Sequence, residues 1–327
     1  MRAVLATTPG GPEVLAVQDL PEPQAPPGRV VVAVEAAGVN FVDTYRREGR
    51  YPMPFPHVVG SEGAGRVVAV GDGVTEVEVG DRVGWVSGSD GSYAEQAVVD
   101  AAALVPLPDG VPADLAAAVL LQGMTAQYLV ASTFPVREGH QVLVHAGAGG
   151  TGLLLTQLAT ARGARVLTTV STPEKEALSR EAGAADVIRY DRLEDLTAEL
   201  PPLVRACTDG GVHTVYDGVG ASTFDASLAS LRPRGGLALF GAASGPVPPV
   251  DPQRLNAAGS VYLTRPFLAH YIATREELLG RAEEVLGRVA DGTLRVRVGQ
   301  RFPLAEAAEA HRALEGRRTT GKVLLLP

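Results

Sequence analysis

The stretch QVLVHAGAGGTG, from Gln141 to Gly152, decides the fold of this chain. It starts as the apolar run of a buried strand, and its glycines follow the spacing G-x-G-x-x-G. That spacing is a weak signal alone, but here it follows a strand pattern and precedes a helical pattern over 150–162. Glycines let the backbone approach a pyrophosphate, whose charge the N–H groups of the following helix stabilise. The alternative is a glycine-rich turn used only for packing. The predicted phosphate contacts are Gly147, Gly149, Gly150, Thr151 and Gly152.

The sequence after this loop alternates between strand and helix patterns. Further apolar runs lie at 165–170, 185–190, 212–217, 236–240 and 261–264. A helix is predicted over 173–182, because proline suits its first position and Gly183 stands just past its end. This alternation is typical of a doubly wound parallel sheet of the α/β class. Residues 121–265 are therefore predicted to form a Rossmann domain that binds a nucleotide.

The first 110 residues have a different pattern. Short β-like runs at 30–34, 66–70, 82–86 and 95–99 are separated by glycine- and proline-rich turns. Such a pattern favours a small irregular barrel or sandwich. A helix over 301–312 and a strand over 323–326 are predicted to return to this part of the chain. The second domain is thus predicted to comprise residues 1–120 and 266–327.

The composition excludes several classes of protein. A chain of 327 residues, 46% of them hydrophobic, suits about two folded domains. The net charge of −8 argues against nucleic acid or an anionic membrane as a partner. The single cysteine, Cys207, can form no intrachain disulfide and no cysteine-rich zinc site. We expect no signal peptide and no apolar run near the ~18 residues of a membrane span, and hence a cytoplasmic protein.

The residues after the second strand of the α/β domain indicate the cofactor. An enzyme that uses NAD usually places Asp or Glu there, to bind the ribose 2′-hydroxyl. Here the strand ends without a carboxylate, in Thr169-Val170-Ser171-Thr172, and Lys175 lies in the first turn of the next helix. The chain has only one other lysine, Lys322. We therefore expect Ser171 and Lys175 to contact the 2′-phosphate of NADPH. The alternative is that Lys175, between two glutamates, is a solvated helix residue.

Five further motifs accompany the glycine loop: GVNFVDTY at 38–45, GRY at 49–51, VGSEGAG at 59–65, VYDGVG at 215–220 and LTRP at 263–266. Together they resemble the medium-chain dehydrogenase/reductase superfamily. Within it the chain is most similar to the NADPH:quinone oxidoreductases, which include the zeta-crystallin-like proteins. The resemblance runs essentially end to end, and the run NFVDTY is typical of the quinone reductase branch.

The resemblance implies a GroES-like β-barrel catalytic domain beside the Rossmann domain. The zinc alcohol dehydrogenases of this superfamily place a ligand cysteine and a ligand histidine at positions that here look like Asn40 and Ser61. Amide and hydroxyl groups are poor zinc ligands beside thiolate and imidazole. We therefore expect no metal site.

The resemblance also implies which residues form the site. Asn40, Tyr45 and Tyr51 are expected at the substrate pocket, with Asn40 also near the nicotinamide ribose. Each has an alternative: Asn40 binds only backbone in a turn, Tyr45 is packing, and Tyr51 anchors a loop. The other implied cofactor contacts are Thr125, Tyr190, Phe240, Gly241, Arg265 and Arg317.

Two expectations concern charged and titratable residues. Asp43 and Arg47 stand four residues apart, which predicts an ion pair on one helix face. His145 ends the first strand of the α/β domain, where packing is favoured over proton transfer.

Without zinc, the chemistry that remains is hydride delivery from a nicotinamide to an electron-poor acceptor. The resemblance implies an NADPH:quinone oxidoreductase, in a family that often produces semiquinone. It also implies a homodimer formed through an edge strand at 260–264. One alternative is an NADPH-dependent enone or enoyl-thioester reductase. The other is a non-catalytic NADPH-binding protein of a structural, crystallin-like or RNA-binding kind.

Overall fold

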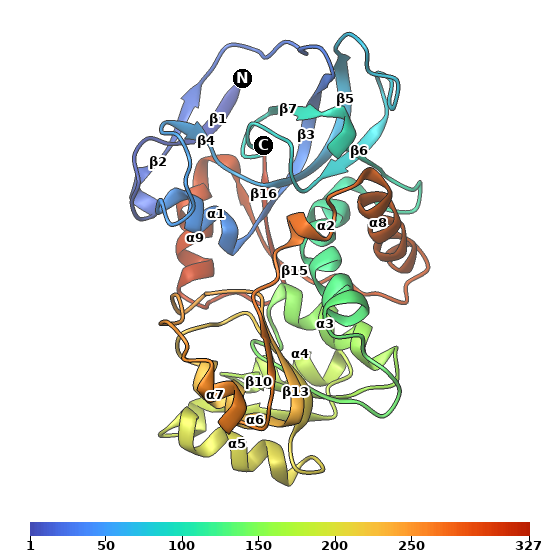
Figure 1. Cartoon of the computed structure of the whole chain (residues 1–327). Coiled ribbons are helices and arrows are strands. Elements are labelled where there is room, and N and C mark those ends of the chain that lie inside the picture. Colours follow the sequence, from blue (N-terminus) through green and yellow to red (C-terminus); the bar gives the residue numbers. More distant parts are fainter. The chain divides into compact units, whose positions relative to one another are not determined.

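A parallel six-stranded sheet is the centre of residues 125–270 in the computed structural model, which describes residues 1–327 (Figure 1). Its strand order is β11-β10-β9-β12-β13-β14, so the chain runs outward from β9 in one direction and outward from β12 in the other. The order therefore reverses between β9 and β12, which is where ligands bind in sheets of this kind. The predicted doubly wound α/β sheet is confirmed.

The strands of this sheet are buried on both faces, as strands covered by helices must be. Leu143, Leu167, Val215 and Leu237 are inaccessible to solvent. The strands are β9 (Gln141–Val144), β10 (Arg165–Val170), β11 (Asp186–Arg189), β12 (Val212–Asp217), β13 (Leu231–Leu239) and β14 (Tyr262–Thr264). The helices are α3 (Gly150–Thr160), α4 (Pro173–Glu181), α5 (Leu196–Ala206), α6 (Phe224–Ser230) and α7 (Gln253–Ala257).

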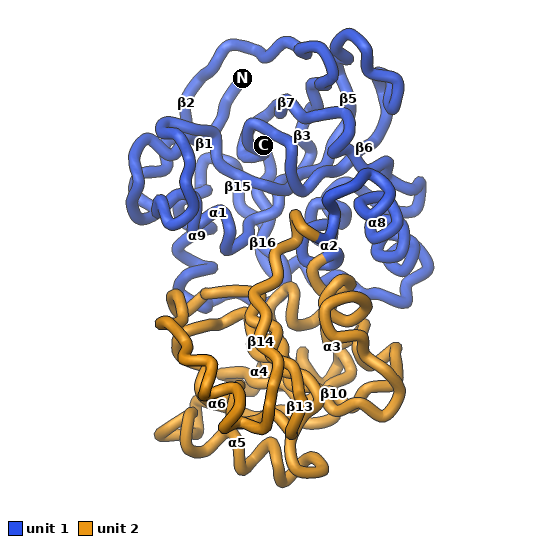
Figure 2. The backbone as a smooth tube through the Cα atoms, viewed as in Figure 1, with its two compact units in different colours: residues 1–124, 271–327 blue, residues 125–270 orange.

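Residues 1–124 and 271–327 form the other compact unit (Figure 2). Its larger sheet has the order β15-β16-β3-β5-β6-β8, with β7 also paired to β3, and its smaller sheet has the order β2-β1-β4. All pairs are antiparallel except β15 with β16. Valines and alanines of alternate positions fill the core between them, together with Trp85 and Tyr93.

The elements of this unit are mostly short strands, as the sequence pattern predicts. The strands are β1 (Arg2–Ala6), β2 (Leu15–Asp19), β3 (Arg29–Val39), β4 (His57–Val58), β5 (Glu62–Val70), β6 (Arg82–Trp85), β7 (Gln96–Asp100), β8 (Val105–Pro106), β15 (Val298–Pro303) and β16 (Lys322–Leu326). The helices are α1 (Phe41–Arg47), α2 (Ala113–Tyr128), α8 (Arg275–Ala290) and α9 (Ala307–Glu315).

The helix predicted over 301–312 is wrong in its first part. Residues 298–303 form β15, and α9 begins only at Ala307. Strand β15 pairs with β16, so a distant partner decides its conformation and the local pattern does not.

One segment is longer and more apolar than the sequence analysis expects. The helical run Ala113–Thr133 has 21 residues, and its most apolar 18-residue window has a mean hydropathy of 1.4, enough by length and composition to cross a membrane. The expectation that no apolar run reaches such a length is therefore wrong. Of its most apolar window, 72% is buried within the protein, which is the behaviour of a core helix.

Candidate active site

Asn40 lies where strand β3 ends and strands β5 and β16 begin. Strand β3 ends at Val39, one residue before Asn40. Its Gly38 pairs with Glu62 at the start of β5, and its Val39 pairs with Val323 near the start of β16. This register places the side chains of Glu62 and Lys322 against that of Asn40. Neither Glu62 nor Lys322 is among the residues predicted for the site.

The side-chain amide of Asn40 is buried and fully hydrogen-bonded. Its Nδ2 donates to Glu62 Oε2 at 2.9 Å and to the carbonyl of Gly38 at 3.2 Å. Its Oδ1 accepts from Lys322 Nζ at 2.8 Å and from Gln122 Nε2 at 3.4 Å. These four contacts use both donors and both lone pairs of an amide. The predicted contact of Asn40 with a ligand stays a prediction, and the geometry supports a role in positioning.

Helix α1 presents a group of aromatic residues. The rings of Tyr45 and Tyr51 meet edge to face at 5.8 Å, and the ring of Phe41 lies 6.2 Å from that of Tyr45. The guanidinium of Arg50 lies 5.4 Å from the centre of the Tyr45 ring. Tyr45 is buried and Tyr51 half-buried. The two tyrosines predicted for the substrate pocket are thus neighbours.

Asp43 does not pair with Arg47, and this prediction is wrong. The carboxylate of Asp43 lies in the first turn of α1, where it accepts from the backbone N–H of Asn40 at 2.9 Å. It also accepts from the Ser61 hydroxyl at 2.6 Å and from the Tyr93 hydroxyl at 3.2 Å. Capping the helix turns the carboxylate toward the helix start and away from Arg47. Burial raises the pKa of Asp43, and the hydrogen bond from Ser61 opposes that shift.

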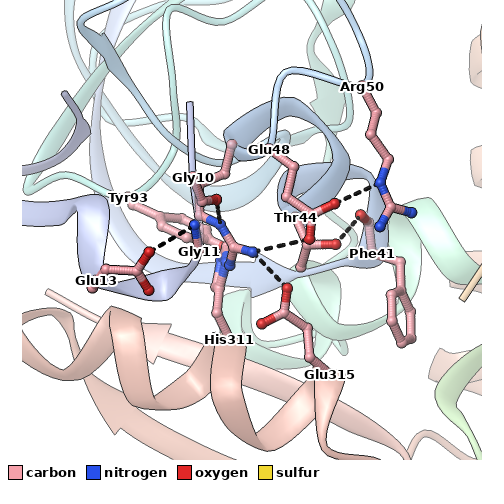
Figure 3. Close-up of polar contacts among 11 residues, drawn as sticks. Gly10, Gly11, Glu13, Phe41, Thr44, Glu48, Arg50, Tyr93, His311 and Glu315 are labelled. Carbon is pink, nitrogen blue, oxygen red and sulfur yellow. Dashed lines mark hydrogen bonds and ion pairs between the residues drawn. The ribbon is translucent and has the colours of Figure 1, made fainter. Parts of the chain in front are cut away.

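Arg47 instead contacts His311 and Glu315, both of which lie on helix α9 (Figure 3). Its guanidinium is only 1% exposed and donates to the Gly10 carbonyl at 3.0 Å and to Glu315 at 2.6 Å. Glu48 is a second carboxylate partner, at 3.2 Å. A buried guanidinium needs such partners, because an unpaired charge in the interior is costly.

The contact between Arg47 and His311 determines the tautomer of the histidine. The Arg47 guanidinium lies 2.9 Å from His311 Nδ1 and can only donate, so Nδ1 accepts and the proton lies on Nε2. His311 Nε2 then donates to the Tyr93 hydroxyl at 3.2 Å, and Tyr93 donates to Asp43. Burial, reinforced by the charge of Arg47, lowers the pKa of His311 to about 3. One directed chain of hydrogen bonds thus joins α9 to α1.

The three glycines of the loop after β9 have different surroundings. A Cβ on Gly147 would lie 2.5 Å from the Thr168 side chain, and one on Gly152 would lie 2.2 Å from the Ala146 carbonyl oxygen. Packing alone therefore accounts for Gly147 and Gly152. A Cβ on Gly149 would meet only the Ala146 carbonyl oxygen, at 3.2 Å. Packing therefore restricts Gly149, which stands at the N-cap of α3, less than it restricts the other two glycines.

Ser171 and Lys175 converge after β10. Lys175 lies in the first turn of α4, and its Nζ donates to the Ser171 hydroxyl at 3.4 Å. Thr172 caps the helix by accepting from the backbone N–H of Lys175. The ammonium group is therefore held at the carboxyl end of β10, where the sequence analysis expects it.

The other predicted cofactor residues follow strand ends or lie on helices. Tyr190 follows β11, Phe240 and Gly241 follow β13, and Arg265 follows β14. Thr125 is buried in α2, and Arg317 follows α9 with a positive φ of 56°. Their contacts with a cofactor stay predictions.

His145 is buried between two hydroxyl groups, as a packing residue would be. Its Nδ1 lies 2.9 Å from Thr169 Oγ1, and its Nε2 lies 2.9 Å from Ser227 Oγ. Burial lowers the pKa of His145. Ser227 in turn donates to Asp217 at the end of β12, so this network ties three strand ends together.

Two family models match the chain. The alcohol dehydrogenase GroES-like domain matches residues 26–109, and a zinc-binding dehydrogenase model matches residues 182–325. The first match agrees with the antiparallel sheets around β3 and establishes the GroES-like domain that the resemblance implies.

The residues of this chain do not fit the zinc that the second family name implies. Asn40 offers an amide whose oxygen already faces an ammonium group, and Lys322 Nζ lies 2.5 Å from the carboxylate of Glu62. A second cation would be repelled there, and Ser61 offers only a hydroxyl that donates to Asp43. No three His, Cys, Asp or Glu side chains gather in a cluster suited to a metal ion.

Relatives of known activity cover the whole chain. A quinone oxidoreductase of Pseudomonas aeruginosa is 47% identical over 320 residues, which are 97% of each chain. A 2-haloacrylate reductase of a Burkholderia species is 39% identical over 97% of this chain and 96% of its own. A mycobacterial structure solved in complex with NADPH superposes with a TM-score of 0.97 at 55% identity, over 100% of both chains. On this evidence the chain is an oxidoreductase that belongs to the quinone oxidoreductase family of the medium-chain dehydrogenase/reductase superfamily.

Proposed function

We propose that this protein reduces quinones with NADPH by hydride transfer that needs no metal. The observation that carries the proposal is the phosphate-binding arrangement of residues 147–175. Gly149 is less tightly packed than the other two glycines of the loop. Strand β10 ends without the carboxylate typical of an NAD-dependent enzyme, and Lys175 lies in the first turn of the helix that follows. The names of the relatives, one quinone oxidoreductase and one structure with NADPH, support the same assignment.

The loop and helix α3 would hold the pyrophosphate, and Ser171 and Lys175 the 2′-phosphate. The backbone N–H groups at the start of α3 point their positive end toward bound phosphate. The ammonium of Lys175 supplies the charge that a 2′-phosphate requires. NADPH, when bound, supplies the hydride.

Tyr45 and Tyr51 are assigned to the acceptor. A tyrosine hydroxyl can donate a hydrogen bond, so Tyr45 is suited to bind a quinone oxygen that gains negative charge. A quinone needs little further polarisation, because its carbonyl groups take up the charge. The contact of Tyr51 with the Tyr45 ring restricts the position of that hydroxyl.

Replacing Lys175 with Ala is expected to raise the Kd for NADPH about 10- to 100-fold, the usual effect of losing a hydrogen bond to a charged group. The Kd for NADH should stay the same. Fluorescence titration with both cofactors measures this. Arg180→Ala on the same helix, whose partner is Glu176, is the control and should leave both affinities unchanged. An unchanged NADPH affinity in Lys175→Ala would show that Lys175 is only a solvated helix residue.

Replacing Gly149 with Ala is expected to weaken NADPH binding at least about tenfold with little change in stability. The added methyl group meets only one backbone atom of the protein but occupies space assigned to phosphate. Calorimetric titration and thermal unfolding measure the two effects. Gly280→Ala, with open space around its added Cβ, is the control. Full affinity in Gly149→Ala would assign the whole loop to packing.

The acceptor class is tested by following NADPH oxidation in parallel. The acceptors are 9,10-phenanthrenequinone, 1,4-benzoquinone, crotonyl-CoA and a 2-haloacrylate. The last is included because one relative is a 2-haloacrylate reductase. Turnover of the quinones supports the proposal, and turnover of only the thioester or the haloacrylate refutes it in favour of C=C reduction. Tight NADPH binding without turnover of any acceptor would identify a non-catalytic protein. Electron paramagnetic resonance during quinone turnover detects a radical product of one-electron reduction.

We also infer a homodimer formed along strand β14. This strand is the edge of the six-stranded sheet, and the side chain of Tyr262 on it is 62% exposed. An exposed edge strand is a template for pairing with a second copy. Light scattering of the wild type and of Leu263→Pro, which blocks pairing at that edge, tests the inference. A monomeric wild type would contradict it.

A further inference from the structure

Lys322 is a buried lysine whose presence the proposed reaction does not explain. Its side chain is 1% exposed, and its Nζ lies 2.5 Å from the Oε2 of Glu62, which is 0% exposed. The desolvation of two charges is costly, so a buried ion pair is weak evidence for stability. In some proteins such a pair serves to select one arrangement of the groups around it.

Gly38 and the backbone N–H of Leu121 make space and a hydrogen bond available to this ion pair. A Cβ on Gly38 would lie 2.3 Å from Glu62 Oε2, 2.5 Å from the Ala117 carbonyl oxygen and 2.8 Å from Lys322 Cε. Only glycine therefore leaves room for the pair at this position of the GVN motif. The second carboxylate oxygen of Glu62 accepts from the backbone N–H of Leu121 at 2.7 Å. Strands β5 and β16 thus supply the two charged side chains, helix α2 binds the carboxylate, and Gly38 of β3 leaves the space.

The pair determines which way the Asn40 amide faces. An ammonium group only donates, so the atom 2.8 Å from Lys322 Nζ must be the amide oxygen. A carboxylate only accepts, so the atom 2.9 Å from Glu62 Oε2 must be the amide nitrogen. The two charges therefore exclude the flipped amide, which would place a donor against the ammonium and an acceptor against the carboxylate.

Asn40 in turn holds the start of helix α1. It is the N-cap of α1, and its backbone N–H donates to the carboxylate of Asp43 in the first turn. Tyr45 lies one turn further along the same helix. A change in the conformation of Asn40 is therefore transmitted to the position of the Tyr45 hydroxyl.

We propose that Lys322 and Glu62 are positioning residues, which act through Asn40 to hold helix α1 and Tyr45 in the arrangement used for reduction. The inference rests on the proposed function only in that Tyr45 is the residue assigned to the acceptor. It assigns no ligand contact to the ion pair itself.

The chain allows a direct spectroscopic test, because it contains only two asparagines, Asn40 and Asn256. Selective labelling with 15N-asparagine gives two pairs of side-chain amide signals, one pair for each asparagine. We expect the Asn40 pair to exchange slowly with solvent, and the pair of Asn256, which is exposed, to exchange fast. In the double variant Lys322→Met/Glu62→Gln, the Asn40 signals should lose this protection at least tenfold while those of Asn256 stay unchanged. Unchanged Asn40 signals would overturn the proposal.

The double variant also separates positioning from stability in a kinetic test. It carries no unpaired buried charge, so it should fold and unfold at a temperature similar to that of the wild type. We expect its kcat for 9,10-phenanthrenequinone to fall about 10- to 100-fold, the size typical of a misplaced catalytic group. Its KM for NADPH should change much less than kcat, because Lys175 and the glycine loop are untouched and only the expected contact of Asn40 with the nicotinamide ribose is affected. Arg301→Met, which breaks the exposed ion pair with Asp114, is the control and should have the kcat of the wild type.

The outcomes distinguish this inference from the proposed function. A wild type that reduces no quinone refutes the proposed function, and the two pairs of asparagine signals still show whether the ion pair holds the amide. A double variant with the kcat of an active wild type overturns the positioning role alone. A variant in which kcat falls only together with folding, measured by circular dichroism, also overturns it. A single Lys322→Met variant, which leaves the Glu62 carboxylate buried without its ammonium partner, should be less stable than the double.

Discussion

Replacing Arg47 with Met is expected to lower the free energy of unfolding by about 3–5 kcal/mol, the usual cost of removing one partner of a buried ionic network. The guanidinium is 1% exposed and lies between α1 and α9. Its loss leaves the Gly10 carbonyl, His311 Nδ1 and the carboxylate of Glu315 without the donor that each now has. Methionine fills part of the volume but donates no hydrogen bond.

Chemical denaturation at pH 7 measures this effect. The matched control is Arg312→Met on α9, which removes an exposed pair with Glu309. An exposed pair contributes about 0–1 kcal/mol, so the control should unfold almost like the wild type. If Arg47→Met lowered the free energy of unfolding no more than Arg312→Met does, the buried network would not contribute to stability.

Replacing His311 with Gln is expected to make the protein less sensitive to acid. Glutamine keeps one acceptor for Arg47 and one donor for Tyr93 but does not titrate. In the wild type, the pKa of His311 is lowered to about 3 by burial and by Arg47, against an unfolded value of about 6.5. A depressed folded pKa means that the unfolded state binds the proton first. The stability that neutral His311 contributes is therefore present above about pH 6.5 and is lost as the pH falls toward 3.

Between pH 7 and pH 4.5 the wild type is therefore expected to lose about 2.5 kcal/mol more unfolding free energy than the variant. The quantity to measure is the difference in unfolding free energy between His311→Gln and the wild type at both values. Other titrating groups, such as Asp43 with its raised pKa, are present in both proteins and cancel to first order. His270→Gln, an exposed position, is the control and should show no such difference. A difference that did not change with pH would mean that the pKa of His311 is the same in the folded protein as in the unfolded chain.

The sequence predicts those parts of the protein that depend on local patterns. The strand, glycine loop and helix of 141–160 follow one another within about 20 residues, and each has its own periodicity or turn residues. Lys175 was recognisable for the same reason, because its place in the first turn of α4 follows from Pro173 and the strand before it.

The polar network of α1 was not predictable in that way. Arg47 contacts a histidine 264 positions away, and Asn40 contacts a lysine 282 positions away. Periodicity and turn residues in a short stretch of sequence do not predict a contact between residues so far apart. Local spacing suggested Asp43 as the partner of Arg47, whereas the need to cap the helix turned that carboxylate elsewhere. One signal was available: Lys322 is one of only two lysines, in a strand pattern that is otherwise apolar.

The contacts of Lys322 and His311 have a consequence for the order in which the chain folds during synthesis. Residues 271–327 complete a unit that begins at residue 1, while residues 125–270 are contiguous. Residues 125–270 are therefore made before residues 271–327, and we expect them to fold first. Strand β3 and helix α1, although made before residue 125, lack β16 and α9 until residues 307–326 have been made. The sheet of the first 124 residues therefore stays incomplete, with an unpaired strand edge, until then. At this stage the nascent chain most needs protection by chaperones.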